Sequence, residues 1–148
     1  MRMYPNTTNT ANTANADNEN KILYSELSYK IVGISYRIQN NLGRFCREAQ
    51  YANAFEEGLK ATNINYVKNK YLPVPVGDKS NIKNWADFII ENKIIVDLKA
   101  KPFVERNDYF QMQRYLRICN FKLGLIINFQ NKYLKPKRVI NSQYSQNL

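Results

Sequence analysis

Three charged side chains interrupt two segments that otherwise have the composition of buried β-strands. Residues 85–90 and 94–100 are mainly apolar and β-branched, yet they contain Asp87, Asp97 and Lys99. A charge in such a place is costly unless it is paired or bound to a metal. The order D…DxK on two adjacent strands is typical of Mg²⁺-dependent sites that hydrolyse phosphodiesters. These residues are therefore the first candidates for catalysis.

The loop between the two segments predicts how the three side chains meet. Asp97 and Lys99 are two residues apart, which places them on one face of a strand. A three-residue loop at 91–93 brings Asp87 opposite Asp97, whereas a loop of two residues would turn Asp87 to the other face. Such a loop needs a left-handed residue, a conformation that Asn92 tolerates. Two facing carboxylates repel each other, and a divalent cation between them removes the conflict. The alternative is an ordinary ion pair at a water-exposed strand end.

Composition narrows the classes of function. The chain has 148 residues, the size of one domain, and its net charge is +10. Such a charge favours polyanionic partners such as nucleic acid, although it also serves solubility alone. The absence of histidine excludes Ser-His-Asp and Cys-His catalysis and histidine-ligated zinc.

Two cysteines and the lack of long apolar runs bear on location. Cys46 and Cys119 follow no metal-ligand spacing, and we expect reduced thiols in a cytoplasmic protein. No apolar run approaches the ~20 residues that a membrane span needs. The first residues lead into Asn and Thr instead of an apolar segment, so we predict no signal peptide and no membrane contact.

We predict one folded domain at residues 22–140. Residues 1–21, rich in Asn and Thr, are expected to form a disordered tail, and residues 141–148 a polar C-terminal tail. Helices are predicted at 22–41, 45–60 and 108–120, and strands at 65–76, 85–90, 94–100, 121–129 and 136–140. Gly43 is the expected stop of the first helix. This order predicts an α/β fold in which helices flank a mixed central sheet that carries the D…DxK hairpin.

Several short motifs resemble, in order and spacing, the GxxExxY proteins, a branch of the PD-(D/E)XK nuclease superfamily. The resemblance covers residues 26–140 and implies a restriction-endonuclease-like core. Phe45 stands where the name of that branch has its glycine, and the nearest glycine is Gly43. The matching pieces are residues 42–43, 48–51, 86–87, 97–100, 111–116 and 124–129.

The resemblance implies roles for the polar residues of these motifs. Asp87, Asp97 and Glu48 would hold Mg²⁺ or Mn²⁺, and Lys99 would contact the scissile phosphate or orient the attacking water. Gln111, four residues before Tyr115 on a helix, would border the site with it. The alternatives are a solvated helix residue for Glu48, a capping box from Asp108 to Gln111, and a core aromatic for Tyr115.

Further residues are candidates for contacts with substrate. Tyr51 is expected to pack beside Glu48 and to hydrogen-bond it. Basic side chains near the motifs are candidates for phosphate contacts, which give affinity without sequence preference, although each alone is as easily a solvated charge. They are Lys101 and Arg114, with Arg44, Arg47, Arg106 and Arg117.

The sequence thus predicts a Mg²⁺- or Mn²⁺-dependent nuclease that acts on DNA or RNA. The main alternative is a catalytically inactive nuclease fold that binds nucleic acid or protein. A third hypothesis is metal-dependent hydrolysis of a nucleotide. Many such nucleases pair to cut both strands, so a homodimer is left open.

Overall fold

The computed structural model describes residues 23–73 and 84–146. The chain divides into two compact units, residues 1–30 and residues 31–148. Helix α2 (Ser25–Leu42) begins in the first unit, where Lys30 and Glu26 form an ion pair of 3.8 Å. The predicted tail at residues 1–21 and the end of the predicted strand 65–76 lie outside the described residues. The predicted domain boundaries therefore stay predictions.

The second unit is built on a mixed sheet with the strand order β1-β2-β3-β4-β5. Neighbouring strands are antiparallel except for the parallel pair β3 and β4, and helix α4 (Arg106–Cys119) connects these two. The strands are β1 (Tyr66–Tyr71), β2 (Trp85–Ile90), β3 (Ile94–Lys99), β4 (Leu123–Asn128) and β5 (Lys137–Ile140). The predicted α/β class is confirmed.

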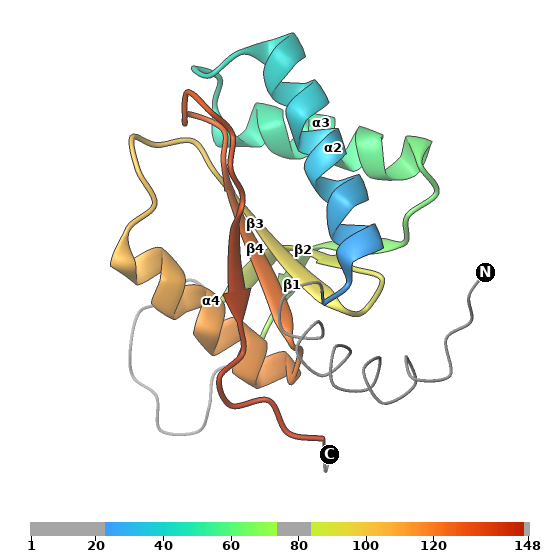
Figure 1. Cartoon of the computed structure of the whole chain (residues 1–148), viewed down its shortest axis with the longest axis vertical. Coiled ribbons are helices and arrows are strands. Elements are labelled where there is room, and N and C mark those ends of the chain that lie inside the picture. Colours follow the sequence, from blue (N-terminus) through green and yellow to red (C-terminus); the bar gives the residue numbers. More distant parts are fainter. Residues whose placement is uncertain (1–22, 74–83, 147–148) are drawn as a thin grey trace, which may run out of the picture. The chain divides into compact units, whose positions relative to one another are not determined.

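Helices cover both faces of this sheet (Figure 1). Helix α3 (Glu48–Ala61) packs on one face, where Phe55 meets Phe88 edge-on at 4.9 Å between ring centroids. Helix α4 packs on the other face, where Met112 and Leu116 join a fully buried cluster that includes Ile95. Each such side chain contributes about 1.5–3 kcal/mol by leaving water.

The hairpin between β2 and β3 has the predicted register. Ile90 pairs with Ile94, and the three-residue turn between them is closed by the Lys93 amide, which donates to the Ile90 carbonyl at 2.9 Å. Asn92 is left-handed as expected, with φ 54°, and Glu91 is left-handed as well, with φ 51°. Counting back along the strands, Asp87 stands level with Asp97.

All three predicted helices begin at other residues, and α2 begins at Ser25 instead of residue 22. Helix α3 begins at Glu48, three residues later than expected, because the Arg47 amide donates to the Gln50 side chain and ends the preceding loop there. The capping box from Asp108 to Gln111, considered as the alternative role of Gln111, does not form. Helix α4 begins earlier, with Glu105 as its N-cap, and the Asp108 carboxylate accepts the Glu105 amide at 2.8 Å. Asp108 is thus the third helical residue.

Candidate active site

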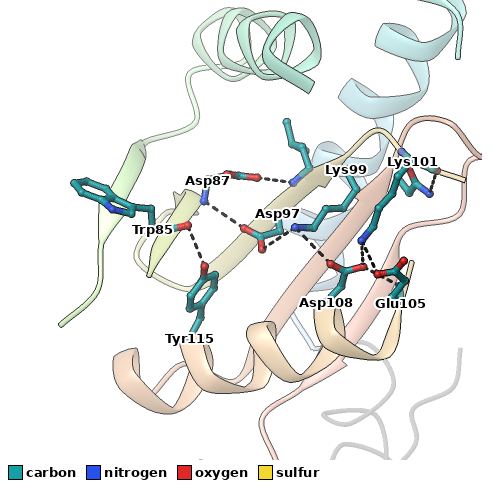
Figure 2. Close-up of polar contacts among 10 residues, drawn as sticks. Trp85, Asp87, Asp97, Lys99, Lys101, Glu105, Asp108 and Tyr115 are labelled. Atoms are coloured by element: carbon teal, nitrogen blue, oxygen red, sulfur yellow. Dashed lines mark hydrogen bonds and ion pairs between the residues drawn. The ribbon is translucent and has the colours of Figure 1, made fainter. Parts of the chain in front are cut away.

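The carboxylates of Asp87 and Asp97 interlock where strands β2 and β3 separate. Regular pairing of the two strands extends only to Phe88 and Val96. Beyond that point the Asp87 amide donates to Asp97 Oδ1 at 3.3 Å, and the Leu98 amide donates to Asp87 Oδ2 at 2.8 Å (Figure 2). Each carboxylate replaces a ladder hydrogen bond of the other strand. Since a carboxylate has about four acceptor sites, this contact leaves capacity for a further ligand.

An irregularity in β2 gives Asp87 its direction. Regular alternation along β2 would place Ala86 and Phe88 on one face of the sheet and Asp87 on the other. Instead Ala86 belongs to the cluster under α4, whereas Phe88 packs on Phe55 of α3. The pleat is therefore interrupted at Asp87. On the neighbouring strand Asn69 lies level with it, has φ 54° and takes no part in the pairing of β1 with β2.

This irregularity opens Asp87 into a cavity of about 290 Å³. Glu48, the first residue of α3, lines the same cavity, so these two predicted site residues border one opening. The whole lining is Glu48, Ala49, Ala52, Asn53, Lys68, Asn69, Asp87 and Phe88. The lining thus combines apolar side chains with an amine, two amides and two carboxylates.

Asp97 and Lys99 lie on the side of α4, so the three side chains do not share one face of the sheet as predicted, because the interrupted pleat turns Asp87 to the side of α3. The Asp97 side chain is 1% exposed, and Lys99 Nζ lies 4.0 Å from its Oδ2. The same amine lies 3.7 Å from Oδ1 of Asp108 on α4, so the lysine is held between two acids. Figure 2 shows this row of side chains continuing from Asp108 to Lys101.

Asp108 connects the two lysines of this row. Its Oδ2 accepts a hydrogen bond from Lys101 Nζ at 2.6 Å, and Glu105 adds an ion pair with Lys101 at 3.6 Å. Burial alone would raise the pKa of Asp108, but the bonds from Lys101 and the Glu105 amide, with the charges of both lysines, lower it. Burial likewise opposes the charge of Lys101, and the acids outweigh it and raise its pKa.

The two tyrosines of the predicted site are fully buried. Burial, followed by the charge of Asp97, raises the pKa of Tyr115, whose hydroxyl donates to the Trp85 carbonyl at 3.2 Å. Burial also raises the pKa of Tyr51. Its hydroxyl donates to the Gly43 carbonyl at 2.5 Å and accepts from the Cys46 amide at 3.2 Å. Both tyrosines therefore brace the backbone around the site.

Two further predicted residues lie on α4. Gln111 is half-buried one turn before Tyr115. Arg114 lies with its guanidinium carbon 5.5 Å from the centre of the Tyr115 ring, and its Nε donates to Asn84 Oδ1 at 3.4 Å. Their roles toward substrate stay predictions.

The sequence analysis missed Asp108 and Asn128 as parts of this region. The buried Asn128, at the end of β4, donates to the Lys101 carbonyl at 2.7 Å and accepts the Lys101 amide at 3.1 Å. It thereby fixes the segment after Lys99. The alternation of Asp97, Lys99 and Lys101 gave a signal for acidic partners on one face, but not their position on α4.

The donor set has the chemistry of a Mg²⁺ or Mn²⁺ site. These ions prefer oxygen ligands, and Mg²⁺ is commonly held by one or two carboxylates together with waters and substrate phosphate. Asp87 and Asp97 meet that minimum, and Glu48 opens onto the cavity of Asp87. Within residues 23–73 and 84–146, no three Asp, Glu, Cys or His side chains form a ready metal-binding group.

Fold and site define a class of protein: a mixed sheet between helices, with D…DxK where two strands part. The sequence model of the PD-(D/E)XK nuclease superfamily matches residues 25–140, and the chain belongs to this superfamily. Comparison with curated proteins and with solved structures gave no match. In the part of the chain that the structure describes, no helix has both the length and the hydrophobicity to cross a membrane.

Proposed function

We propose that this protein is a nuclease that requires Mg²⁺ or Mn²⁺ and hydrolyses phosphodiester bonds of nucleic acid. The observation that carries the proposal is the interlocked pair of Asp87 and Asp97 with Lys99 at ion-pair distance. Two neighbouring carboxylates repel each other, and a bound cation would remove that repulsion.

Each residue of the candidate site has its own role in this proposal. Asp87 and Asp97 would hold the metal, with Glu48 as a further ligand from the cavity side. When bound, the metal lowers the pKa of a water molecule, so that hydroxide is present near neutral pH without histidine. Lys99 brings a positive charge to the negative charge that develops on the phosphate in the transition state. Asp108 fixes where that amine lies.

Substrate affinity would come from contacts with phosphates. The net charge of +10 favours an anionic substrate, and a metal ion held at the cavity would offset the charges of Glu48 and Asp87 there. Contacts with phosphates position nucleic acid without reading its sequence. Lys101 and Arg114 remain candidates for such contacts. For the protein as a whole, we also propose a cytoplasmic location, a homodimer and membership of the GxxExxY branch.

A specific observation favours a second candidate, an inactive nuclease fold that binds nucleic acid or protein. Lys99 is shared between Asp97 and Asp108, and the carboxylates of Asp87 and Asp97 each accept a backbone amide. A site that has lost its metal could keep all of these contacts.

Cleavage assays separate the two candidates. The purified protein is incubated with Mn²⁺ or Mg²⁺ and with labelled single-stranded DNA, duplex DNA or RNA, beside Asp87→Ala and Lys99→Ala. The matched control is Glu57→Gln, an exposed acid on the same helix as Glu48. We expect cleavage by the wild type and the control, and none by the two site variants. If every substrate stays intact in the presence of metal while a gel shift shows binding, the inactive fold is correct.

A further inference from the structure

Two aromatic side chains form an exposed pair beside the site. Tyr71 and Trp85 face each other across β1 and β2, with ring centroids 5.0 Å apart and planes inclined at 60°. Tyr71 is 47% exposed and Trp85 50%. Single exposed aromatics are ordinary on a protein surface. A contacting pair at the end of an edge strand offers a continuous surface of π-systems.

The pair lies on the side of the sheet to which Asp87 opens. Ala86 and Leu72, its neighbours in sequence, both belong to the cluster under α4. Alternation along the strands therefore turns Trp85 and Tyr71 away from α4. Trp85 precedes Asp87 by two residues, a rise of about 6.5 Å along a strand. This separation is of the order of one nucleotide in an extended single strand.

The backbone that carries the pair is held in place. The Leu72 amide donates to the Asn84 carbonyl at 2.7 Å, and Asn84 Nδ2 donates to the Leu72 carbonyl at 2.5 Å. Tyr115 holds the Trp85 carbonyl from α4. Because both segments are fixed, the rings need little further ordering when they bind a ligand, which favours affinity.

The net charge of +10 favours an anionic ligand for the chain as a whole. Lys68 lines the cavity that Asp87 enters and forms an ion pair with Glu56 at 3.1 Å, whereas Lys70 lies level with Ala86 and so faces α4. The first turn of α3 faces the same cavity with Glu48, and Asp87 adds a second acid, so a metal ion held there would balance the charge of a phosphate. A ligand that combines a planar ring with a phosphate would satisfy the aromatic pair and the cavity together.

We propose that Tyr71 and Trp85 form a stacking platform for an unpaired base next to the phosphate that is cleaved, so that the substrate is single-stranded nucleic acid. Aromatic side chains bind bases of any sequence by stacking, whereas a duplex keeps its bases within its own stack. The proposal rests on the proposed function for the position of the phosphate. Stacking itself does not depend on cleavage.

The fluorescence of Trp85, the one tryptophan of the chain, tests the platform directly. The full-length protein is titrated in EDTA with a single-stranded oligothymidylate, with its blunt duplex and with an oligomer of abasic sugar phosphates. We expect quenching by the single strand and little by the other two. Equal quenching by all three would overturn the proposal, and so would a change that depends on protein concentration alone, which would indicate pairing of two copies through this surface.

Variants make the test independent of fluorescence. By anisotropy of a labelled oligomer, Tyr71→Ala and Trp85→Ala should weaken binding about 5- to 100-fold each. Tyr133→Ala, at a tyrosine that is 79% exposed, should change the dissociation constant less than twofold. Circular dichroism and thermal melting identify any variant that fails to fold, and Tyr71→Phe should then retain binding. If both alanine variants fold and bind like the wild type, the platform is wrong.

The same data separate this proposal from the nuclease proposal. Quenching in EDTA without cleavage in Mn²⁺ would leave the platform standing and remove the enzyme. Cleavage of duplex and single strand alike, without quenching, would support the nuclease and remove the platform.

Discussion

Charged side chains gather in two regions on opposite sides of the sheet, and the regions differ in how their charges are balanced. The first, the α4 cluster, consists of Lys99, Lys101, Glu105 and Asp108. The side chains of Asp108 and Lys99 are only 10% and 11% exposed, and every member has an oppositely charged partner within 4.0 Å. The second, the α3 cavity, contains Glu48, Lys68 and Asp87 and opens to solvent; Lys68 is paired with Glu56 at 3.1 Å, and both of these side chains are 25% exposed.

This difference indicates which groups stabilise the fold and which are accessible to a ligand. Charges in the α4 cluster neutralise one another and are largely withdrawn from water, so we expect their removal to cost stability. Charges at the α3 cavity are more exposed than those of the α4 cluster, so their removal should affect binding more than stability. The pair of Asp87 and Asp97 joins the two regions, because each carboxylate bonds to the backbone of the other strand.

The largest effect is expected for Asp97→Asn, which tests whether the pair of Asp87 and Asp97 binds the metal. The new amide oxygen can still accept the Asp87 amide, so the fold should persist, but a metal ligand is lost. We expect kcat/KM in Mn²⁺ to fall at least ~100-fold, since metal catalysis contributes several kcal/mol. In the wild type, Mn²⁺ at 100 times its Kd should stabilise the protein by about 2.7 kcal/mol, which appears as a higher Tm.

The control for this variant is its own melting curve without metal. A Tm close to that of the wild type in EDTA, combined with no rise in Mn²⁺, assigns the effect to metal binding. An unchanged rise in Tm would show that Mn²⁺ binds elsewhere.

The next effect is expected for Asp108→Asn, which breaks the balance of the α4 cluster. The substitution leaves Lys99 and Lys101 facing a neutral group, and we expect a loss of about 2 kcal/mol in the free energy of unfolding, discounted for the partial exposure of Lys101. Urea unfolding measures it. Glu105→Gln is the matched control, because Glu105 is 61% exposed and should matter much less.

The pH dependence of this loss has a definite sign. The folded pKa of Asp108 is lowered from its ordinary value of 3.8, so the contribution of the carboxylate is complete above that value. It disappears as pH falls through the folded pKa. The difference between wild type and Asp108→Asn should therefore be constant at neutral pH and shrink in strong acid. A difference that grows in acid would contradict this assignment.

Local rules predicted the hairpin but not the α4 cluster, and the reason is physical. The register of Asp87 and Asp97 follows from the length of one loop, and Asn92 has the conformational tolerance that this loop requires. Asp108 lies on a different element, and its contact with Lys99 depends on how α4 packs on the sheet. Its sequence context also fits a helix cap, so its neighbours alone gave two interpretations.

The interruption of the pleat at Asp87 was beyond sequence reasoning for a similar reason. Asn69 is one of many asparagines, and the motif around it has no turn signal. Its left-handed φ becomes meaningful only because β1 and β2 pair on both sides of it. The motif therefore identified which residues meet, whereas tertiary packing decides which way each one points.

A smaller effect on stability is expected for Glu48→Gln, which probes the α3 cavity. Glu48 is exposed at the start of its helix, and surface substitutions of this kind change the free energy of unfolding by less than about 0.5 kcal/mol. We expect weaker Mn²⁺ binding, measured by calorimetry, with an almost unchanged Tm in EDTA. Glu57→Gln, on the same helix, should leave both quantities unchanged. A large loss of stability would show that the charges at the α3 cavity contribute to the fold as much as those of the α4 cluster do.

The smallest effect concerns Glu56, whose carboxylate accepts hydrogen bonds from the Tyr66 hydroxyl at 2.6 Å and from Lys68 Nζ at 3.1 Å. The bond from Tyr66, followed by that from Lys68, lowers the pKa of Glu56, and the same contact raises the pKa of Tyr66 to about 12. A raised folded pKa means that the contribution of neutral Tyr66 is complete below pH 10.0 and is lost as pH rises through the folded value.

Glu56→Gln removes this charge and should move the Tyr66 pKa back toward 10.0. Nuclear magnetic resonance of ring-labelled tyrosine follows the titration, and Tyr66→Phe assigns the signal. Because a quarter of the Glu56 and Lys68 side chains remains exposed, more than for Asp108 and Lys99, the variant should melt closer to the wild type than Asp108→Asn does. If the tyrosine titrates at the same pH in both proteins, the carboxylate does not control it, and the rim of the α3 cavity is more loosely organised than its hydrogen bonds indicate.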